Sequence, residues 1–336
     1  MTQKQDTPII LAIESSCDDT AAAVIQNRKI LANIVSSQTM HGVYGGVIPE
    51  LAGRAHQQYI LPVVVKALKD AGITASELDA IAYTRGPGLM GSLLVGSQFA
   101  KGMAMGLDIP TIGINHLQAH VAAHYIADEQ PGFPFLCLLV SGGHTQILLV
   151  KDYLEMEIIG STIDDAAGEA FDKTAKMLGL PYPGGPLVDQ LAEEGNPLAF
   201  QFPKANISGY NYSFSGLKTS LLYFLQKQTA ADPDFIQKNL NDICASMRHT
   251  IIKTLLSQFE KAIKDLNIQY IGIAGGVSAN RLLRRSFEEL GKKYKVKSFV
   301  PAFEYCTDNA GMIAIAGHYQ YIKGNFNSLD DLPFAR

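Results

Sequence analysis

The sequence predicts an α/β protein with two domains, and three observations support that prediction. Apolar strand-like segments alternate with helix-length segments along the chain, which is typical of an α/β layer structure. A strand, a short polar turn and a second strand open the chain, and the same pattern returns near its middle. The length of 336 residues is enough for two domains that each bury a core of their own.

The first predicted domain opens with strands at 9–13 and 21–25 around the acidic, hydroxyl-rich turn 14–20. Such a turn is either a polar tip that holds a metal or phosphate, or a solvated hairpin, and the residues leave both interpretations open. The elements expected next are, in order, a helix at 57–71, a strand at 78–83, the turn 85–91, a small-residue helix through Leu107 and a strand at 109–114.

His116 and His120 lie four residues apart, directly after the strand at 109–114. Residues at i and i+4 share one helix face, so a helix that starts near His116 directs both imidazoles toward one ion. The pair is common by chance and needs a third ligand. The best candidate is Asp308, although it precedes the apolar stretch 311–322 and could cap a helix there instead. Two histidines and one carboxylate leave coordination positions open, as in a working metal site.

His124 lies one further step of four residues along the chain. Each such step drifts by ~40° around a helix, so three imidazoles from one helix converge poorly on a single ion. We therefore favour Asp308 as the third ligand and expect His124 at the surface of its lobe.

The second predicted domain begins after the linker-like segment 128–134. Strands are expected at 135–140 and 146–150, on either side of the turn 141–145, which contains a Gly-Gly pair. Another Gly-Gly turn, 275–280, joins a predicted strand to a basic segment. Glycine pairs let backbone N–H groups approach a ligand, and helix N-termini favour anionic groups. One such turn is more often only a tight turn, but three polar turns in this order indicate a nucleotide site.

Between these two turns lies an insert rich in Pro and Gly, around 160–225, which we expect to be irregular. Pro and Gly at this density define loop geometry, which suits a wall around a substrate and equally suits a simple connection. Its most marked segments are 164–174, 180–186 and 212–218.

Composition and charge limit the class of function. A net charge of −4 gives the whole protein no attraction to nucleic acid, so RNA contact is expected from a local patch or a partner. Four widely spaced cysteines without a CxxC pair are expected to be reduced thiols. No apolar run reaches the ~18 residues of a membrane helix, and 1–8 is polar where a signal peptide is apolar. We expect a cytoplasmic protein with no membrane contact.

Taken together, the motifs closely resemble those of the tRNA N6-adenosine threonylcarbamoyltransferases, the TsaD family. The resemblance covers nearly the whole chain, and the chain departs from the family at Asn115, where a histidine is frequent. That position is therefore not expected to be essential. The segments that carry the resemblance are 13–20, 44–52, 115–120, 139–146, 164–175, 182–186, 214–219, 275–280 and 306–309.

The resemblance implies the actin, hexokinase and Hsp70 type of fold (ASKHA), with duplicated α/β lobes and a ligand cleft between them. The first lobe is expected to comprise 1–127 with 308–336, and the second 133–307. The family transfers a threonylcarbamoyl group from threonylcarbamoyl-adenylate to the exocyclic amine of the adenosine 3′ of the anticodon, in tRNAs that read codons starting with adenosine. AMP is released.

The resemblance also implies site residues. His116, His120 and Asp308 are expected to bind one divalent metal ion per chain, iron or zinc. Glu14 is the candidate catalytic residue that positions or deprotonates the amine, although it could equally hold a metal-bound water. His144 could touch ligand oxygens or be structural. Residues expected to line the site for threonylcarbamoyl-adenylate or ATP are Leu139, Val140, Ser141, Gly142, Gly143, Asp172, Gly185, Asp189 and Asn280.

The implied partners are tRNA, a smaller inactive paralogue (TsaB-like) that pairs with the first lobe, and a small ATPase (TsaE-like). The apolar stretch 88–107 could form the interface with the paralogue or belong to the core. A basic cluster could meet RNA phosphates, although a solvated helix face is the favoured explanation. Its members are Arg281, Arg284, Arg285, Lys292, Lys293, Lys295 and Lys297.

Three other functions are alternatives to the transferase. An ATPase or kinase of the same fold would use the Gly turns for ATP alone. A zinc metallopeptidase would require HExxH, and Leu117 occupies the position of the glutamate. A scaffold subunit without enzymatic activity would tolerate loss of the metal ligands.

Overall fold

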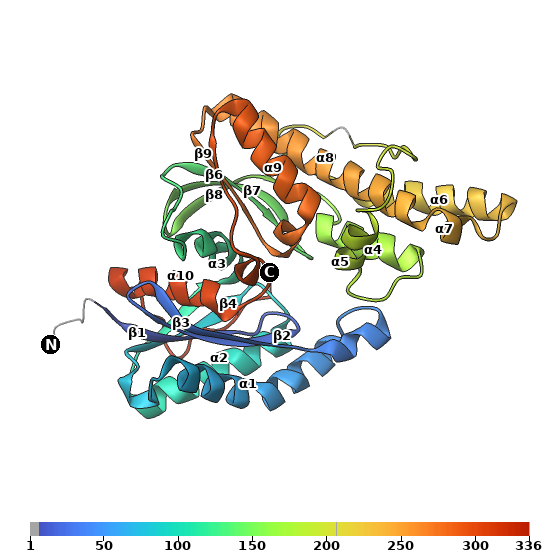
Figure 1. Ribbon diagram of the computed structural model, residues 1–336. Coiled ribbons are helices and arrows are strands. Elements are labelled where there is room, and N and C mark those ends of the chain that lie inside the picture. Colours follow the sequence, from blue (N-terminus) through green and yellow to red (C-terminus); the bar gives the residue numbers. More distant parts are fainter. Residues whose placement is uncertain (1–6, 206, 336) are drawn as a thin grey trace. The chain divides into compact units, whose positions relative to one another are not determined.

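The computed structural model describes residues 7–205 and 207–335, and the chain divides into two compact units (Figure 1). Unit 1 consists of Met1–Gln130, Tyr153–Glu155 and Pro301–Arg336, and unit 2 of Pro131–Asp152 and Met156–Val300. Unit 1 contains both segments of the expected first lobe and also takes in 301–307, which the sequence analysis assigned to the second. Residues 1–6 lie outside the described part of the chain, so the signal-peptide argument stays a prediction.

Unit 1 is built on a mixed five-stranded sheet in the order β3-β2-β1-β4-β5. The predicted hairpin is present, because β1 and β2 pair antiparallel. Strands β1, β4 and β5 run parallel, and the side chains of β1 and β4 are almost all buried, which explains their apolar sequence. The strands are β1 (Ile9–Glu14), β2 (Asp19–Gln26), β3 (Lys29–Ser37), β4 (Ala80–Gly86) and β5 (Thr111–Asn115).

Helices cover both faces of this sheet (Figure 1). α1 (Pro49–Ala71) and α2 (Met90–Leu107) lie on one face, and α10 (Ala310–Lys323) lies on the other. α1 begins earlier than predicted because Pro49 occupies its first position, where a missing N–H breaks no helical hydrogen bond. The short helix α3 (His116–Ala122) follows β5 directly.

Unit 2 repeats the same sheet. Its order is β10-β9-β6-β7-β8; β6 pairs antiparallel with β7 and parallel with β9, which in turn is parallel to β10. In chain order these strands occupy the same places as β1 to β5 in unit 1, so the predicted duplication of the α/β lobe is confirmed. The strands are β6 (Phe135–Val140), β7 (Thr145–Asp152), β8 (Glu155–Ser161), β9 (Tyr270–Ala274) and β10 (Lys297–Phe299).

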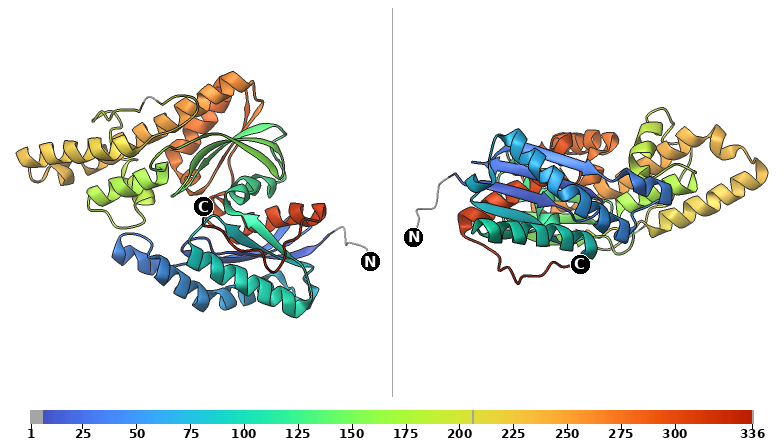
Figure 2. Two further views of the ribbon diagram at one scale, coloured as in Figure 1. Left: turned by 180° about the vertical axis from the view of Figure 1, so that it is seen from behind. Right: turned by 90° about the horizontal axis from the view of Figure 1, so that it is seen from below.

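The insert around 160–225 contains helices at Ala167–Met177, at Gly184–Leu191 and from Ser215 onward, whereas the described residues of 192–214 contain none, so the expectation of an irregular insert was right only in part. Its prolines do not prevent helix formation, because Pro183 is the N-cap of α5 and Pro186 lies in its first turn. The helices of unit 2 are α4 (Ala167–Met177), α5 (Gly184–Leu191), α6 (Ser215–Ala231), α7 (Phe235–Lys238), α8 (Leu240–Leu266) and α9 (Arg281–Tyr294). Figure 2 shows α8 extending well beyond the sheet of this unit.

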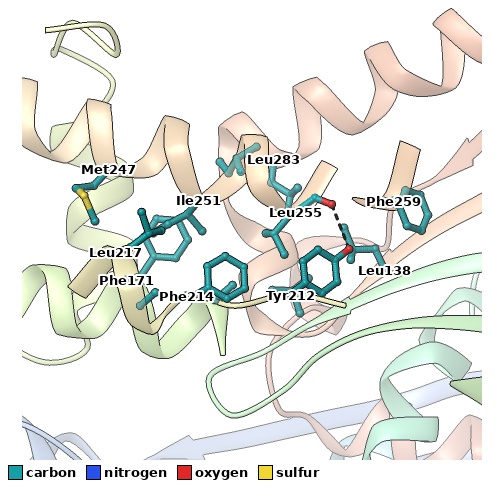
Figure 3. Close-up of a cluster of buried hydrophobic side chains, with 14 of the residues drawn as sticks. Leu138, Phe171, Tyr212, Phe214, Leu217, Met247, Ile251, Leu255, Phe259 and Leu283 are labelled. Carbon is teal, nitrogen blue, oxygen red and sulfur yellow. Dashed lines mark hydrogen bonds between the residues drawn. The ribbon is translucent and has the colours of Figure 1, made fainter. Parts of the chain in front are cut away.

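The core of unit 2 fills the space between α4, α6, α8, α9 and the sheet (Figure 3). The Tyr212 hydroxyl, fully inside this core, donates to the Leu255 carbonyl oxygen at 3.1 Å, so burial leaves no unpaired phenol there. All four cysteines are free, as predicted. None of the helices described here combines the length and apolar character that crossing a membrane requires.

Candidate functional site

The two histidines lie on α3, which begins at His116 as predicted. Asn115 is the N-cap of this helix, and its side-chain oxygen accepts the N–H groups of Leu117 and Gln118 at 3.0 and 3.1 Å. The imidazoles of His116 and His120 are both buried, with ring centroids 4.7 Å apart. Asn115, the position that departs from the family pattern, thus starts the helix that directs both rings to one side.

Asp308 lies directly before α10, but it does not cap that helix. The N-cap is Asn309, whose side-chain oxygen accepts the N–H of Met312 at 3.0 Å, so the capping alternative is wrong. The carboxylate of Asp308 instead lies 3.2 Å from His120 Nε2 and 3.6 Å from His116 Nε2. Asp308 is more than 180 residues away in sequence from both histidines, and the packing of α10 on the sheet brings them together.

The three side chains fit a divalent metal ion. Their ligand atoms lie within 4.8 Å of one another. In a tetrahedral site with bonds of ~2.1 Å, ligand atoms stand about 3.4 Å apart, close to the separations of 3.2 and 3.6 Å found here. Neither ring nitrogen of the buried His120 makes a hydrogen bond with a described residue, and coordination through Nε2 would give that atom a partner. Two imidazoles and a carboxylate suit iron or zinc.

Glu14 lies behind His116 and is fully buried. Its carboxylate accepts the N–H of Ser16 and the hydroxyl of Thr84, and one oxygen lies 3.2 Å from His116 Nδ1. Burial alone would raise the pKa of this carboxyl, but the charge and hydrogen bond of His116 hold it below its usual value.

The same contact acts on the imidazole. Burial opposes its charge, but Glu14 and Asp308 outweigh burial and raise the pKa of His116 to about 9. With Nδ1–H donated to Glu14, the Nε2 atom of His116 is the one that faces Asp308 and the position of an ion. A carboxylate that accepts from one imidazole nitrogen in this way would orient the ring if its other nitrogen bound a metal.

The prediction that His124 lies at the surface was wrong. α3 ends at Ala122 and the chain continues as a 3-10 helix, Ala123–Tyr125, which changes the direction of the next side chain. His124 is buried, its Nδ1 lies 2.9 Å from the Val121 carbonyl oxygen, and it is not in the metal-ligand group.

In unit 2, the two Gly-Gly turns meet at one edge of the sheet. β6 and β9 are parallel neighbours, so the turns that follow them, 141–145 and 275–280, lie side by side. Gly275 has φ +86°, and a Cβ there would come within 2.5 Å of the Val140 carbonyl oxygen, so only glycine fits. The first turn is closed by Ser141, whose N–H donates to the His144 carbonyl at 2.8 Å.

The remaining residues expected around the nucleotide accept hydrogen bonds from the starts of α5 and α9. The carboxylate of Asp172 accepts the N–H groups of Gly184 and Gly185 at 3.0 and 3.1 Å, and burial is the main reason that its pKa is raised. Asp189 accepts the N–H of Arg281 at 3.3 Å. Asn280 caps α9, as its side-chain oxygen accepts the Leu283 N–H at 3.0 Å.

Three glycines of the two turns leave their backbone open at this edge. A Cβ added to any of them would meet no atom within 4 Å; they are Gly142, Gly143 and Gly276. A Cβ on Gly185 would lie 3.8 Å from the Cβ of Phe171, an ordinary contact. Leu139 and Val140, by contrast, are strand residues with fully buried side chains, so only their backbone could face a ligand.

Sequence analysis missed Arg248, which is 5% exposed and lies on α8. Its guanidinium donates to the Asp189 carboxylate at 2.8 Å and to Glu193. The sequence signal that could have revealed it is a single arginine among apolar residues of a long helix. An arginine buried at such a position requires a buried partner for its charge.

Solved structures with low sequence identity share this fold. HypF from T. kodakarensis superposes with a TM-score of 0.65 at 14% identity, over 97% of this chain and 50% of that one. Component A of the (R)-2-hydroxyglutaryl-CoA dehydratase from Acidaminococcus fermentans gives a TM-score of 0.54 at 16% identity, over 94% and 98% of the two chains. At these identities the likeness concerns the fold alone, and it confirms the predicted ASKHA fold class.

Sequence comparison is far more specific. The family described as tRNA N6-adenosine threonylcarbamoyltransferase matches residues 29–315. Relatives with that name include a protein of Cytophaga hutchinsonii, 57% identical over 100% of this chain and 98% of its own length, and one of Christiangramia forsetii, 60% identical over 94% of each. These names do not support the ATPase, peptidase or scaffold alternatives. The chain belongs to the tRNA N6-adenosine threonylcarbamoyltransferase family.

Proposed function

We propose that this protein transfers a threonylcarbamoyl group from threonylcarbamoyl-adenylate to the exocyclic amine of the adenosine 3′ of the anticodon, in tRNAs that read codons starting with adenosine. The amine nitrogen attacks the carbamoyl carbonyl carbon, the bond from that carbon to the phosphate oxygen breaks, and AMP leaves with the electron pair while the amine loses a proton. The observation that carries the proposal is the His116, His120 and Asp308 group in a chain whose relatives bear the transferase name.

The metal ligands give the reaction its proposed electrostatic component. When bound there, an iron or zinc ion would supply Lewis-acid polarisation of the acyl phosphate. The side chain of Asp308 is 25% exposed while those of His116 and His120 are 10% and 0% exposed, so the group is accessible from the Asp308 side. The protein's own part is to hold the two Nε2 atoms and the carboxylate in place before substrate arrives.

Glu14 is best supported as a positioning residue. A group that deprotonates the amine must come within hydrogen-bond reach of it. The Glu14 carboxylate is instead fully buried and occupied by Ser16, Thr84 and His116. We therefore place it behind the metal ligands, where it orients the His116 ring.

We further propose that unit 2 binds the adenylate at the edge formed by its Gly turns. The support is the open backbone at Gly142, Gly143 and Gly276, which leaves room for ligand atoms close to the main chain. The N-terminus of α9, which begins directly after Asn280, adds a helix dipole that favours an anionic group.

A smaller paralogue and a small ATPase are proposed as partners, with a separate synthase that supplies the adenylate in the cytoplasm. The chain offers a surface of suitable character for the paralogue, since Met90, Leu94 and Met105 of α2 are exposed.

Reconstitution tests the proposed function. Purified protein, the partners, the synthase, threonine, bicarbonate, ATP and a tRNA with the target adenosine should yield threonylcarbamoyl-adenosine in a nucleoside digest. Omission of this chain should abolish the product, and Asp308→Ala should lower the rate at least ~100-fold. If protein fully loaded with metal released AMP but left the tRNA unmodified, the proposed transferase function would be wrong and the ATPase alternative would be favoured.

A further inference from the structure

Positive charge is concentrated in unit 2. From the sequence, unit 2 carries 18 Lys and Arg against 16 Asp and Glu, a formal charge of +2, while unit 1 carries 10 against 16, a formal charge of −6. A polyanion is therefore attracted to unit 2 and repelled by unit 1. The question is which basic side chains of unit 2 are available to it.

Much of the basic cluster expected from the sequence is already engaged. Arg285 lies 3.0 Å from Glu193, and Lys293 lies 2.8 Å from Glu260. Arg284 donates to the Ser278 carbonyl at 2.8 Å. These carboxylates offset the charge along α9, which agrees with the favoured explanation of a solvated helix face.

A different set of basic residues lies along α8. His249, Lys253 and Lys261 are spaced by multiples of four residues, so they lie within about 120° of the helix circumference over a rise of about 18 Å. The loop before α6 brings Lys204 to the same helix, where its ammonium lies 3.3 Å from the Ser257 hydroxyl. We call Lys204, His249, Lys253 and Lys261 the α8 basic surface.

This surface is held in shape by contacts between the loop and α8. The Gln258 amide donates to the carbonyls of Ile207 and Asn211 at 3.4 and 3.0 Å, and Lys261 donates to the Gly209 carbonyl at 3.2 Å. The Lys261 ammonium also lies 5.6 Å from the centre of the Tyr210 ring. Lysines on an ordered scaffold lose less side-chain entropy on binding than free ones do.

The charges on this surface repel one another. Burial, followed by the charge of Lys253, lowers the pKa of Lys204, and burial with the charges of Lys253 and Lys204 lowers the pKa of His249. Within the described part of the chain, the neighbouring charges found to act on these two residues are thus positive. An anion placed between them would remove that repulsion.

We propose that the α8 basic surface binds the phosphate backbone of the tRNA substrate. The proposal rests on the proposed function, which makes tRNA the substrate. Lysine ammonium groups are typical phosphate contacts, which position RNA without selecting its sequence. The surface therefore contributes affinity and orientation, while the chemistry belongs to the metal ligands.

The test is binding of a tRNA transcript to the assembled enzyme at several salt concentrations. Lys204→Gln with Lys253→Gln should weaken binding about 10-fold near 0.15 M salt and reduce the slope of log K against log salt by about 1 for each lost phosphate contact. In the transfer assay KM for tRNA should rise similarly, with kcat nearly unchanged at saturation. Lys204→Arg with Lys253→Arg, which keeps both positive charges, should retain tRNA binding.

The matched control removes two charges of the same unit that are already paired. Lys151 lies 2.8 Å from Glu157 and Lys238 lies 2.7 Å from Asp232, so Lys151→Gln with Lys238→Gln should change tRNA affinity less than twofold. Equal tRNA binding by the test variant and wild type would overturn the proposal. The proposal would also be overturned if the test variant bound tRNA normally but no longer bound one of the partner proteins, because the surface would then bind that protein. Failure of wild type to modify tRNA would instead count against the proposed function.

Discussion

The Nε2 atom of His56 donates a hydrogen bond to the carbonyl oxygen of Cys17 at 2.9 Å. Because a carbonyl only accepts, this contact assigns the tautomer, and Nδ1 accepts from the Thr20 hydroxyl at 2.8 Å. The Ser92 hydroxyl donates to the same carbonyl at 3.0 Å. Side chains from α1 and α2 therefore hold the loop that directly follows Glu14.

Replacing His56 should disturb that loop and, through it, the support of the metal ligands. His56→Ala leaves the Thr20 hydroxyl and the Cys17 carbonyl short of a partner, so the transfer rate should fall about 10-fold or more. His56→Gln can still donate to the carbonyl and should recover part of the rate. Rates and melting temperatures of both variants provide the check; full activity in His56→Ala would show that Ser92 alone holds the loop.

Removal of the Glu14 charge should weaken metal binding. Glu14→Gln keeps the size of the side chain but loses the charge that orients His116, and loss of such a partner typically costs 10- to 100-fold in metal affinity. Metal content by elemental analysis and competition with a chelator measure the effect. His116→Ala with His120→Ala, the reference for a lost site, should hold far less than one ion per chain, and Glu50→Gln on the exposed start of α1 should behave as wild type.

Two glycines of unit 2 should respond differently to substitution. A Cβ on Gly143 meets no atom within 4 Å, so Gly143→Val should leave stability nearly unchanged while nucleotide affinity falls ~10-fold or more, because the side chain occupies ligand space. A Cβ on Gly168 would lie 2.5 Å from the Ser141 carbonyl oxygen, so Gly168→Ala should lower stability as well. Calorimetry and thermal unfolding separate the two. Unchanged nucleotide affinity in Gly143→Val would remove that turn from the site.

The buried ion pair of Arg248 and Asp189 should be costly to break. Their charged atoms lie 2.8 Å apart with side chains 6% and 12% exposed. Arg248→Met leaves the buried carboxylate of Asp189 without its charged partner and should lower the free energy of unfolding by about 3 kcal/mol or more. Arg54→Met, which removes an exposed pair with Glu50, should cost less than about 1 kcal/mol. Similar values for both in urea unfolding would mean that Asp189 finds another partner.

Asp19 should make stability depend on pH. Burial is the main cause that raises the pKa of Asp19 to about 7, opposed by a hydrogen bond to Ser37 and reinforced by the charge of Asp308. Since this folded pKa lies above the usual 3.8, ionisation of Asp19 costs stability progressively as pH rises from about 4 to 7. Asp19→Asn should therefore stabilise the metal-free protein at pH 8, by at least ~1 kcal/mol.

The advantage of Asp19→Asn should shrink as pH falls toward 5. Chemical unfolding of wild type and Asp19→Asn side by side at pH 5, 6, 7 and 8 measures it. A constant difference across this range would mean that Asp19 keeps an ordinary pKa.

Local features of the chain were predictable from sequence because their causes are local. The apolar runs of β1 and β6, the polar turns after them and the helix that starts at His116 depend on residues within a few positions of one another. The repeated strand pattern predicted the duplicated sheet for the same reason. Helix α5 of the insert was not predicted, because prolines at a helix start have the same sequence signature as prolines in loops.

The tertiary structure alone decided which distant residues meet. His116 and Asp308 become neighbours because α10 packs on the sheet and on α3, the helix that follows β5. No periodicity links positions so far apart in the sequence. The inward turn of His124 follows from a change of helix type after Ala122, and the partners of Glu14 and Asp189 follow from packing between elements. Sequence patterns reflect contacts between near neighbours, whereas a site is made by the long-range packing that brings its side chains together.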